Sequence, residues 1–454
     1  MGSPSLLQPV KKATRITCSG DVAHNTGRNA SPTDTTQQKT GVGSAPRRLA
    51  PRHAVQRLTP DELLNEISGV DNLLIVQDLD GVCMDLVKDP LTRQMDRHYV
   101  EAAAKLAGRF SVLTNGEHEG KRGVNRLVEQ ALGDPDRAAR DGLYLPGLAA
   151  GGVQLQNSHG QLSHPGVSDE EMDFLAALPQ RMETALYARV ESLMPALEGD
   201  AVRREVNKAV LDTQVSPTIN LNGLFSLCPN DVSLQQSLQR MLEELMHDLL
   251  AQAEGQGLGN SFFLHVAPNL GRDAAGQERL KPAQPGDVGS TDIQFMLRGA
   301  IKEAGLLVLI NRHIAARTGT APLGENFNVR SAPHDHGELL KLCEKAIPNE
   351  QMPRLVGVGD TVTSTYCSDT QTWLRGGSDR GFLTLLQEIG ERYNQPNRVV
   401  LVDSSGGEVD RPSLNNPALK GISDLEDPLH FNVLMPGGPQ QYVAWFRQLA
   451  DRWA

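Results

Sequence analysis

The chain has 454 residues, of which 39% are hydrophobic and 22% are charged, and its formal net charge is −11. This length and balance suit a globular protein with one large domain or a few smaller ones. The negative charge argues against nonspecific binding to nucleic acid, which needs clustered cationic side chains. No apolar run approaches the ~20 residues that cross a bilayer, so we also expect no membrane partner.

The cysteines are spaced widely along the chain, at Cys18, Cys83, Cys228, Cys343 and Cys367. They form no CxxC pair, so the sequence predicts neither a zinc site nor a disulfide framework. Scattered thiols of this kind are typical of a reducing cytoplasm, where we expect the protein to act.

The first stretch, residues 1–57, differs in composition from the rest of the chain. It is rich in Ser, Thr, Gly, Pro, Lys and Arg, and its only acidic residues are Asp21 and Asp34. Without hydrophobic periodicity it cannot bury enough apolar surface to offset chain entropy, so we predict a disordered tail. The alternative is a transit peptide, which is also acid-poor and rich in Ser and Arg.

Short apolar strands then alternate with amphipathic helices at both ends of the remaining sequence. The expected strands cover residues 72–76, 110–113, 354–358 and 398–403, and the expected helices cover residues 99–108, 123–132, 302–317, 381–390 and 441–453. Continuous apolar runs are typical of strands buried on both faces of a parallel sheet. The alternation predicts an α/β fold with a doubly wound, Rossmann-like core.

The middle of the chain, residues 167–295, has a different pattern. Its expected elements are a helix opened by a Ser168–Glu171 capping box, a helix over residues 233–254, and strands over residues 261–266 and 292–297. This mixture predicts an inserted α+β domain. The insertion would divide the core into residues 58–166 and 296–454.

Asp78 and Asp80 directly follow the first apolar strand, where open α/β sheets bind their ligands. Residues two apart in an extended segment point to the same side, and Gly81 allows a sharp turn after them. Two close carboxylates repel each other unless a cation intervenes, and hard oxygen ligands suit Mg²⁺. The pair therefore predicts a metal site, although acids at this spacing also serve as turn and helix-capping residues.

Two further motifs end apolar strands. Thr114 precedes Asn115 and Gly116, and a hydroxyl group followed by backbone amides can cradle a phosphate. Asn-Gly by itself is more typical of a plain turn. Asp360 ends the third strand, and in a parallel sheet it would lie beside Asp78 and could hold the metal.

Two charged residues stand at the beginnings of helices. Lys302 could neutralise a phosphate group, although a solvated surface position is the usual fate of lysine. Asp379 precedes the helix expected at residues 381–390, so it could be a second metal ligand or a helix cap.

Together these motifs resemble those of the haloacid dehalogenase superfamily of phosphatases. That superfamily has a DxD motif after the first strand, a hydroxyl residue after the second, a lysine and a GD motif. Here these correspond in order to Asp78 and Asp80, Thr114, Lys302, and Asp360. The insert between Thr114 and Lys302 resembles the C2-type cap of the superfamily.

Longer stretches are similar to the glucosylglycerol-phosphate phosphatase family. They cover residues 75–84, 113–118, 142–153, 257–263 and 357–364, and the similarity runs through nearly all of the chain from about Leu63 onward. The resemblance implies hydrolysis of 2-O-(α-D-glucosyl)-sn-glycerol 3-phosphate to the compatible solute glucosylglycerol, which supports salt tolerance.

The resemblance also implies a role for each motif. Asp78 would attack phosphorus to form an aspartyl-phosphate, and Asp80 would act as general acid and then general base. Mg²⁺ would be held by Asp78, the backbone carbonyl of Asp80 and Asp360. Thr114 and Lys302 would bind the transferring phosphoryl oxygens.

One position departs from the superfamily pattern. A second acid often follows shortly after the GD aspartate, where this chain has Ser364 and Thr365. The later acids are Asp369, in a polar stretch that suggests a loop, and Asp379. We favour Asp379 as the second metal acid because it directly precedes a helix.

The inserted cap is expected to read the sugar. Candidate substrate-binding residues are Asn115, Lys121, Arg122, His265, Asn269 and Arg272, with Asp273 beside them. Each could also be a structural or surface residue.

The expected partner is a small sugar phosphate, together with the synthase that would supply it. Rival substrates are sucrose phosphate and mannosylglycerate phosphate. A phosphotransferase using the same aspartyl-phosphate and a noncatalytic homologue that binds the synthase are further alternatives.

Overall fold

The computed structural model describes residues 57–195, 199–211 and 213–453. The predicted tail, residues 1–57, therefore lies outside the described residues except for its last position. Among the helices described, none combines the length and the apolar character needed to cross a membrane.

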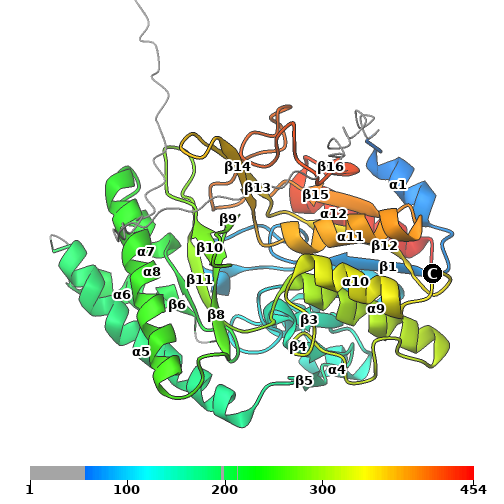
Figure 1. The fold of residues 1–454 in the computed structure, drawn as a ribbon, viewed down its shortest axis with the longest axis horizontal. Helices are drawn as coiled ribbons and strands as arrows, with labels where there is room; N and C mark the ends of the chain where they lie inside the picture. Colours follow the sequence, from blue (N-terminus) through cyan, green and yellow to red (C-terminus); the bar gives the residue numbers. More distant parts are fainter. Residues whose placement is uncertain (1–56, 196–198, 212, 454) are drawn as a thin grey trace, which may run out of the picture.

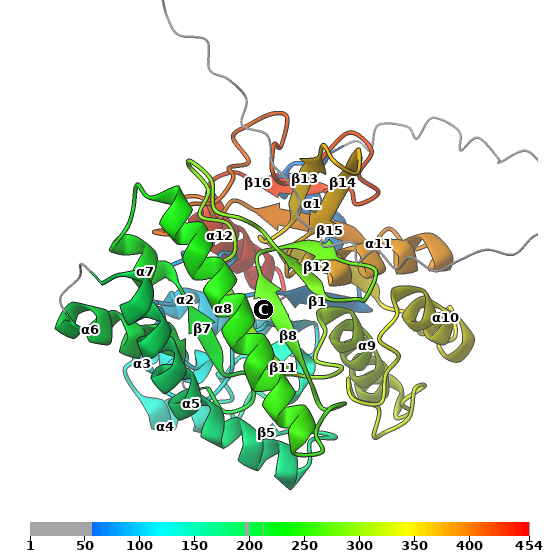
Figure 2. The same cartoon turned by 60° about the vertical axis from the view of Figure 1, so that its left-hand side comes forward.

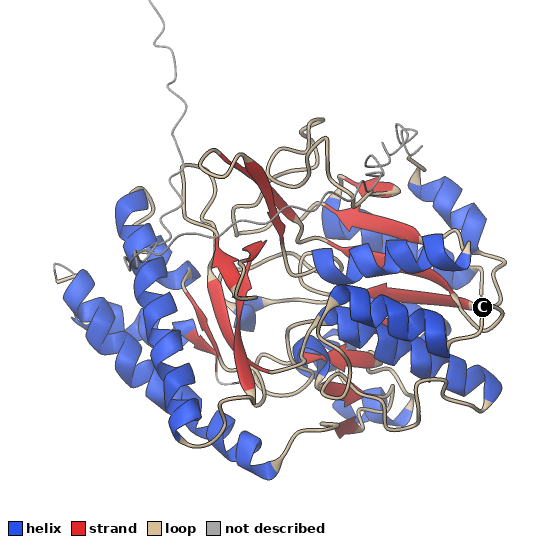
Figure 3. Cartoon of the chain, viewed as in Figure 1, coloured by secondary structure: helices blue, strands red, loops and turns tan. Residues whose placement is uncertain are grey.

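An eight-stranded sheet forms the centre of the larger part of the molecule (Figure 1, Figure 3), in the order β16–β15–β12–β1–β2–β3–β4–β5. Its strands are β1 (Leu73–Gln77), β2 (Phe110–Leu113), β3 (Gly147–Ala149), β4 (Gln154–Gln156), β5 (Leu162–Ser163), β12 (Arg354–Gly359), β15 (Arg398–Val402) and β16 (Val433–Met435). The strands from β16 to β3 pair in parallel, and β4 and β5 continue the sheet antiparallel.

Helices cover both faces of this sheet, which confirms the predicted doubly wound α/β class. One face carries α9 (Lys302–Thr318), α10 (His336–Ala346) and α11 (Arg380–Tyr393), and the other carries α1 (Pro60–Ile67), α2 (Arg97–Lys105), α3 (Val124–Leu132) and α12 (Gly438–Asp451). Within β1, Leu74 and Val76 pack with the first group, whereas Leu73 and Ile75 pack with the second. The continuous apolar run is explained by burial on both faces.

A second, four-stranded antiparallel sheet stands beside the first, in the order β6–β7–β11–β8. The elements of this region are α5 (Asp169–Leu193), α6 (Gly199–Ala209), β6 (Val210–Leu211), β7 (Thr218–Asn220), α7 (Asn222–Ser226), α8 (Val232–Gly255), β8 (Phe262–Ala267) and β11 (Asp292–Leu297). Helices α5 and α8 lie against one face of this sheet (Figure 2). The predicted Ser168–Glu171 capping box opens α5.

The sequence did not predict two hairpins, β9 (Asn269–Arg272) with β10 (Glu278–Leu280), and β13 (Thr363–Cys367) with β14 (Thr372–Gly376). The short elements α4 (Pro135–Arg140), η1 (Pro90–Thr92) and η2 (Ala150–Gly152) were also not anticipated. These strands contain many polar residues and no apolar run, so hydrophobic patterning gave no signal for them. The strand predictions at residues 110–113 and 292–297 are confirmed to the residue.

Candidate active site

Neighbouring parallel strands bring the predicted motifs to one edge of the main sheet. Asp78 follows β1, Thr114 follows β2 and Asp360 follows β12. Strands β12, β1 and β2 are adjacent and parallel, so their carboxyl ends meet. Lys302 in the first turn of α9 and Asp379 just before α11 reach the same place.

Lys302 is buried between two aspartates. Its Nζ lies 2.6 Å from Asp78 Oδ2 and 2.7 Å from Asp379 Oδ1. Burial opposes the charge of this lysine, but the two carboxylates outweigh burial and raise its pKa. The alternative of a solvated surface lysine is therefore wrong for Lys302.

Asp379 occupies the N-cap position of α11, yet its side chain does not cap that helix. Its Oδ2 instead accepts hydrogen bonds from the backbone N–H groups of Asp360 and Thr361, both at 3.0 Å. The carboxylate thus braces the strand end that carries Asp360. Asp369, the other candidate from the sequence, lies in the turn between β13 and β14.

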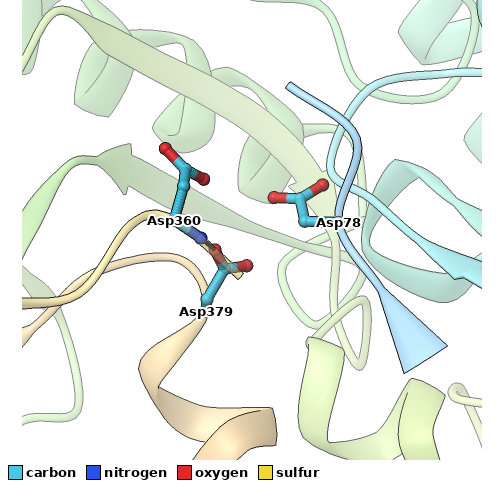
Figure 4. A group of neighbouring side chains, drawn as sticks. All are labelled: Asp78, Asp360 and Asp379. Atoms are coloured by element: carbon cyan, nitrogen blue, oxygen red, sulfur yellow. Dashed lines mark hydrogen bonds between the residues drawn. The ribbon is translucent and has the colours of Figure 1, made fainter. Parts of the chain in front are cut away.

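Asp78, Asp360 and Asp379 form a compact buried group (Figure 4), in which one carboxylate oxygen from each residue lies within 4.8 Å of the other two. Burial raises the pKa of Asp78 to about 7, and Asp379 adds to this shift while Lys302 opposes it. Burial, together with Asp379 and Asp78, also raises the pKa of Asp360 well above its ordinary value. Asp360 Oδ1 is buried and has no hydrogen-bond partner in the described part of the chain. Crowded carboxylates with an unsatisfied oxygen fit a divalent cation such as Mg²⁺.

The carboxylate of Asp80 lies apart from this group. Arg93 Nη1 donates to both of its oxygens, at 3.1 Å and 2.8 Å. Arg93 is itself buried, and its Nε donates to the Pro90 carbonyl at 3.1 Å. Any metal contact from Asp80 would therefore come from its backbone carbonyl, as the resemblance implies. Gly81 follows with a φ of +76°, and a Cβ there would lie 2.3 Å from Asp360 Oδ2, so only glycine fits.

Most of the motif residues line a cavity between the edge of the main sheet and the second sheet, termed the central cavity, whereas Lys302 lines a neighbouring cavity. Its lining includes Asp78, Asp80, Thr114 and Asp360 from the main sheet, Thr218, Asn220, Asp292 and Gln294 from the second sheet, and Arg93, Arg122 and Arg411 from loops. The catalytic candidates thus face a polar wall contributed by a distant part of the chain.

The strand register explains why that wall is polar. Gln294 pairs with Thr218 and with His265, and Asp292 pairs with Asn220, so these side chains share one face of the second sheet. The alternate residues, such as Ile293, are buried in the core that α5 and α8 help to form. One face of the second sheet therefore builds its core while the other faces the central cavity.

Comparison with known proteins identifies the family to which this site belongs. Residues 72–450 match the family model described as glucosylglycerol-phosphate phosphatase. The chain belongs to the glucosylglycerol-phosphate phosphatase family. A curated glucosylglycerol-phosphate phosphatase from Synechocystis sp. is 49% identical over 397 residues, which are 85% of this chain and 94% of that protein. The predicted class of enzyme, a phosphoric monoester hydrolase, is confirmed by this membership.

The solved structures that resemble this chain are much less similar to it in sequence than the Synechocystis protein is. The C-terminal domain of trehalose-6-phosphate phosphatase from Candida albicans is 13% identical with a TM-score of 0.45, covering 88% of this chain and 99% of that one. The C-terminal domain of the trehalose synthase regulatory protein from the same organism is 8% identical with a TM-score of 0.39, covering 82% of this chain and 97% of that one.

Three of the residues predicted to bind the sugar do not line the central cavity. They line the neighbouring cavity. His265, Asn269 and Arg272 lie there, whereas Asn115 lines both cavities. His265 Nδ1 lies 2.8 Å from Glu278 Oε2, and its Nε2 lies 2.8 Å from Asn115 Nδ2. The Asn269 side-chain amide bonds to Glu278 and to backbone groups of β8, β9 and Gly377, so this side chain has a structural role.

The remaining candidates divide in a similar way. Arg122 lines the central cavity, and its backbone carbonyl accepts a hydrogen bond from Arg93. Lys121 is exposed and lines neither of these two cavities. Asp273 Oδ1 accepts from the backbone of the turn between β9 and β10, so it shapes that turn.

Sequence reasoning missed several residues of the central cavity: Arg93, Asn220, Asp292, Gln294 and Arg411. A signal existed for two of them. Asp292 and Gln294 alternate with Ile293 and Phe295 in a strand that the sequence did predict, and such alternation marks a polar face. Arg93 and Arg411 lie in irregular segments, where the local pattern gives no indication of what they contact.

Proposed function

We propose that this chain is a Mg²⁺-dependent phosphatase that hydrolyses 2-O-(α-D-glucosyl)-sn-glycerol 3-phosphate to glucosylglycerol and phosphate. The observation that carries the proposal is the buried Asp78 carboxylate, which lies 2.6 Å from Lys302 Nζ beside two further aspartates. Family membership supports the choice of substrate. The product would serve as a compatible solute in salt tolerance.

The nucleophile in this proposal is Asp78. Its Oδ1 accepts a hydrogen bond of 2.8 Å from the Leu79 N–H, and its Oδ2 faces Lys302, so both oxygens are oriented. Attack on phosphorus forms an aspartyl-phosphate and breaks the bond between phosphorus and the glycerol oxygen. Asp80 gives a proton to the leaving oxygen. Asp80 then accepts a proton from the water that cleaves the aspartyl-phosphate, which regenerates the Asp78 carboxylate and the Asp80 carboxylic acid and releases phosphate.

The metal would be held by the Asp78 and Asp360 carboxylates, the Asp80 backbone carbonyl and Asp379. When bound, Mg²⁺ supplies positive charge that offsets repulsion between the attacking carboxylate and the phosphate. Lys302 and Thr114 bind the equatorial phosphoryl oxygens from the protein side. Lys302 also keeps Asp78 oriented toward the cavity.

The proposed organisation is a core of residues 58–166 and 296–454 with a cap of residues 167–295. The cap would read the glucosyl group, because the core side of the central cavity supplies mainly phosphate and metal ligands. A cytoplasmic location agrees with four buried cysteines that form no disulfide among the described residues, which are Cys83, Cys228, Cys343 and Cys367. Substrate would come from the synthase that makes glucosylglycerol phosphate.

The deciding experiment measures phosphate release from a panel of sugar phosphates, with Mg²⁺ and with a chelator, for the wild type and for Asp78→Asn. We expect the highest kcat/KM for glucosylglycerol 3-phosphate, no turnover with chelator, and none for Asp78→Asn. Preference for sucrose phosphate or mannosylglycerate phosphate would reassign the substrate. Near-wild-type release by Asp78→Asn would contradict the proposed nucleophile, and no Mg²⁺-dependent release would favour a noncatalytic role.

A further inference from the structure

Apart from Asp360 Oδ1 in the proposed metal site, the buried polar atoms of central-cavity residues that have no hydrogen-bond partner among the described residues include two outside that site. They are Oε1 of Gln294 and Nε of Arg411. Buried polar groups in native proteins nearly always have partners, so unsatisfied ones need a specific explanation. One of these atoms accepts hydrogen bonds and the other donates them, and neither belongs to the proposed phosphate or metal site.

Gln294 is held on a rigid wall. It lies in the middle of β11, which pairs on one side with β7 and on the other with β8. Its neighbour on the same face, Asp292, accepts hydrogen bonds from Asn220 Nδ2 and Thr291 Oγ1, each at 2.7 Å. The side chains around Gln294 are therefore held by hydrogen bonds within the protein, whereas the Gln294 side-chain oxygen is available to accept a hydrogen bond from a ligand.

Arg411 reaches the cavity from the long loop between β15 and β16. Asp403, which directly follows β15, accepts hydrogen bonds from Ser413 Oγ at 2.8 Å and from the Leu414 N–H at 2.9 Å. On the other side of Arg411, the Glu408 N–H donates to the Leu86 carbonyl at 2.8 Å. These contacts pin the loop both before and after Arg411.

Arg411 lines the central cavity together with Asp292 and Asp360. Burial lowers its pKa, and the carboxylates that act against this shift most strongly are Asp292 and Asp360. Asp292 belongs to the second sheet and Asp360 to the main sheet. Arg411 therefore stands between the wall that carries Gln294 and the group of aspartates around Asp78.

A hydroxylated ligand fits this arrangement best. A hydroxyl group can donate to Gln294 Oε1 and can accept from Arg411 Nε, so a polyol or sugar satisfies both atoms. A phosphate dianion offers only acceptors and would leave the Gln294 oxygen unsatisfied. We infer that Gln294 and Arg411 bind hydroxyl groups of the leaving group and determine the preference for a glycosylated substrate over small phosphate esters.

This inference rests on the proposed phosphatase function and can be tested with Gln294→Met and Arg411→Met. These changes keep much of the side-chain length but remove the hydrogen-bonding atoms. The quantity to measure is the ratio of kcat/KM for glucosylglycerol 3-phosphate to kcat/KM for p-nitrophenyl phosphate, which lacks sugar hydroxyl groups. We expect each change to lower this ratio by about 10-fold or more, because an unpaired buried group penalises the complex.

The exposed residues Gln277 and Arg447 provide matched controls. Gln277→Met and Arg447→Met should leave the ratio as in the wild type. A second readout is inhibition of p-nitrophenyl phosphate hydrolysis by free glucosylglycerol, which should weaken in Gln294→Met and Arg411→Met. Circular dichroism of each variant checks that it is folded. A Gln294→Glu variant retains an acceptor, so its kcat/KM ratio should fall between those of the wild type and Gln294→Met.

The possible results distinguish a failure of this inference from a failure of the proposed function. If the wild type prefers another sugar phosphate, the proposed substrate fails, and the ratio is then measured with the preferred sugar. If the wild type prefers glucosylglycerol 3-phosphate but both variants keep the ratio, only the inference is overturned. An equal loss on both substrates for Arg411→Met would mean that Arg411 binds the phosphoryl group, which also overturns its assignment.

Discussion

Lys302 Nζ lies 2.7 Å from Asp379 Oδ1, and the other oxygen of Asp379 accepts hydrogen bonds from the backbone N–H groups of Asp360 and Thr361. A carboxylate at the start of α11 therefore links the lysine of α9 to the end of β12. Through Lys302 this link extends to Asp78, at 2.6 Å. The proposed nucleophile and the proposed metal ligands are thus held by one buried network.

The first prediction concerns the second metal acid. Asp379→Asn should lower the apparent affinity for Mg²⁺ by about 10-fold or more, because it removes a proposed metal ligand and also the carboxylate that orients the Asp360 backbone, and loss of an orienting group alone costs about 10- to 100-fold. Asp369→Asn is the matched control, because Asp369 lies in the β13–β14 turn, and it should behave as the wild type. Titration of activity with Mg²⁺ measures both. A Mg²⁺ dependence changed by Asp369→Asn and not by Asp379→Asn would reverse the assignment.

The second prediction concerns Arg93, whose Nη1 contacts both oxygens of Asp80. Without this contact Asp80 loses its fixed orientation, so Arg93→Met should lower kcat by about 10- to 100-fold, a part of what a placed acid–base group contributes. KM should change much less, because Arg93 is already paired with Asp80. Arg97→Met removes an exposed arginine of α2 and serves as the control. An unchanged kcat in Arg93→Met would exclude a positioning role.

The third prediction concerns Glu117, a buried acid in the loop after β2. Its carboxylate accepts hydrogen bonds from the backbone N–H groups of Gln214, Val215 and Ser216, each at 2.8 Å, and from Ser216 Oγ at 2.9 Å. Burial raises the pKa of Glu117, and these hydrogen bonds act against that shift. The contact joins the main sheet to the segment that precedes β7.

Glu117→Gln places an amide N–H₂ group against these donors. It should lower the free energy of unfolding by about 2–3 kcal/mol, since hydrogen bonds to a charged group are lost. Glu119→Gln changes an exposed acid two residues away and should have an effect within about 0.5 kcal/mol. Urea denaturation measures both values. Equal stabilities of the two variants would show that the Glu117 contact is energetically neutral.

The fourth prediction concerns pH and His118, which is fully buried. Burial lowers the pKa of His118 to about 4, although a hydrogen bond to the Gly147 carbonyl opposes the shift. In the unfolded chain its pKa is near 6.5. The unfolded state therefore binds the extra proton between these values, and the contribution of His118 to stability is present above pH ~6.5 and is lost as the pH falls toward 4.

Between pH 7 and pH 5 the wild type should lose about 2 kcal/mol more stability than His118→Gln, which cannot take up the proton. Urea denaturation at both pH values measures this difference. Other titrating groups are common to both proteins and cancel in the comparison. His98→Gln, at an exposed site, should show the same pH dependence as the wild type. An identical pH dependence of His118→Gln and the wild type would contradict a buried neutral imidazole.

Much of the fold could be read from the sequence because the relevant signals are local. Residues 73–76 are all apolar, and a continuous apolar run of this kind is typical of a strand covered on both faces. The acids and the hydroxyl residue directly follow such strands, so the parallel pairing of β12, β1 and β2 is enough to bring Asp78, Thr114 and Asp360 together. Their convergence follows from the sheet geometry.

The partners of those residues were decided by the tertiary structure alone. Arg93 and Arg411 lie in irregular segments. Glu117 contacts the segment before β7, and its partner Ser216 is 99 positions away along the chain. Asp379 could have capped α11, and only its distance to Lys302 and to the β12 end shows that it does not. A local pattern reports which face of an element is apolar. It does not report which distant polar group meets that face, because such contacts depend on how the two sheets pack.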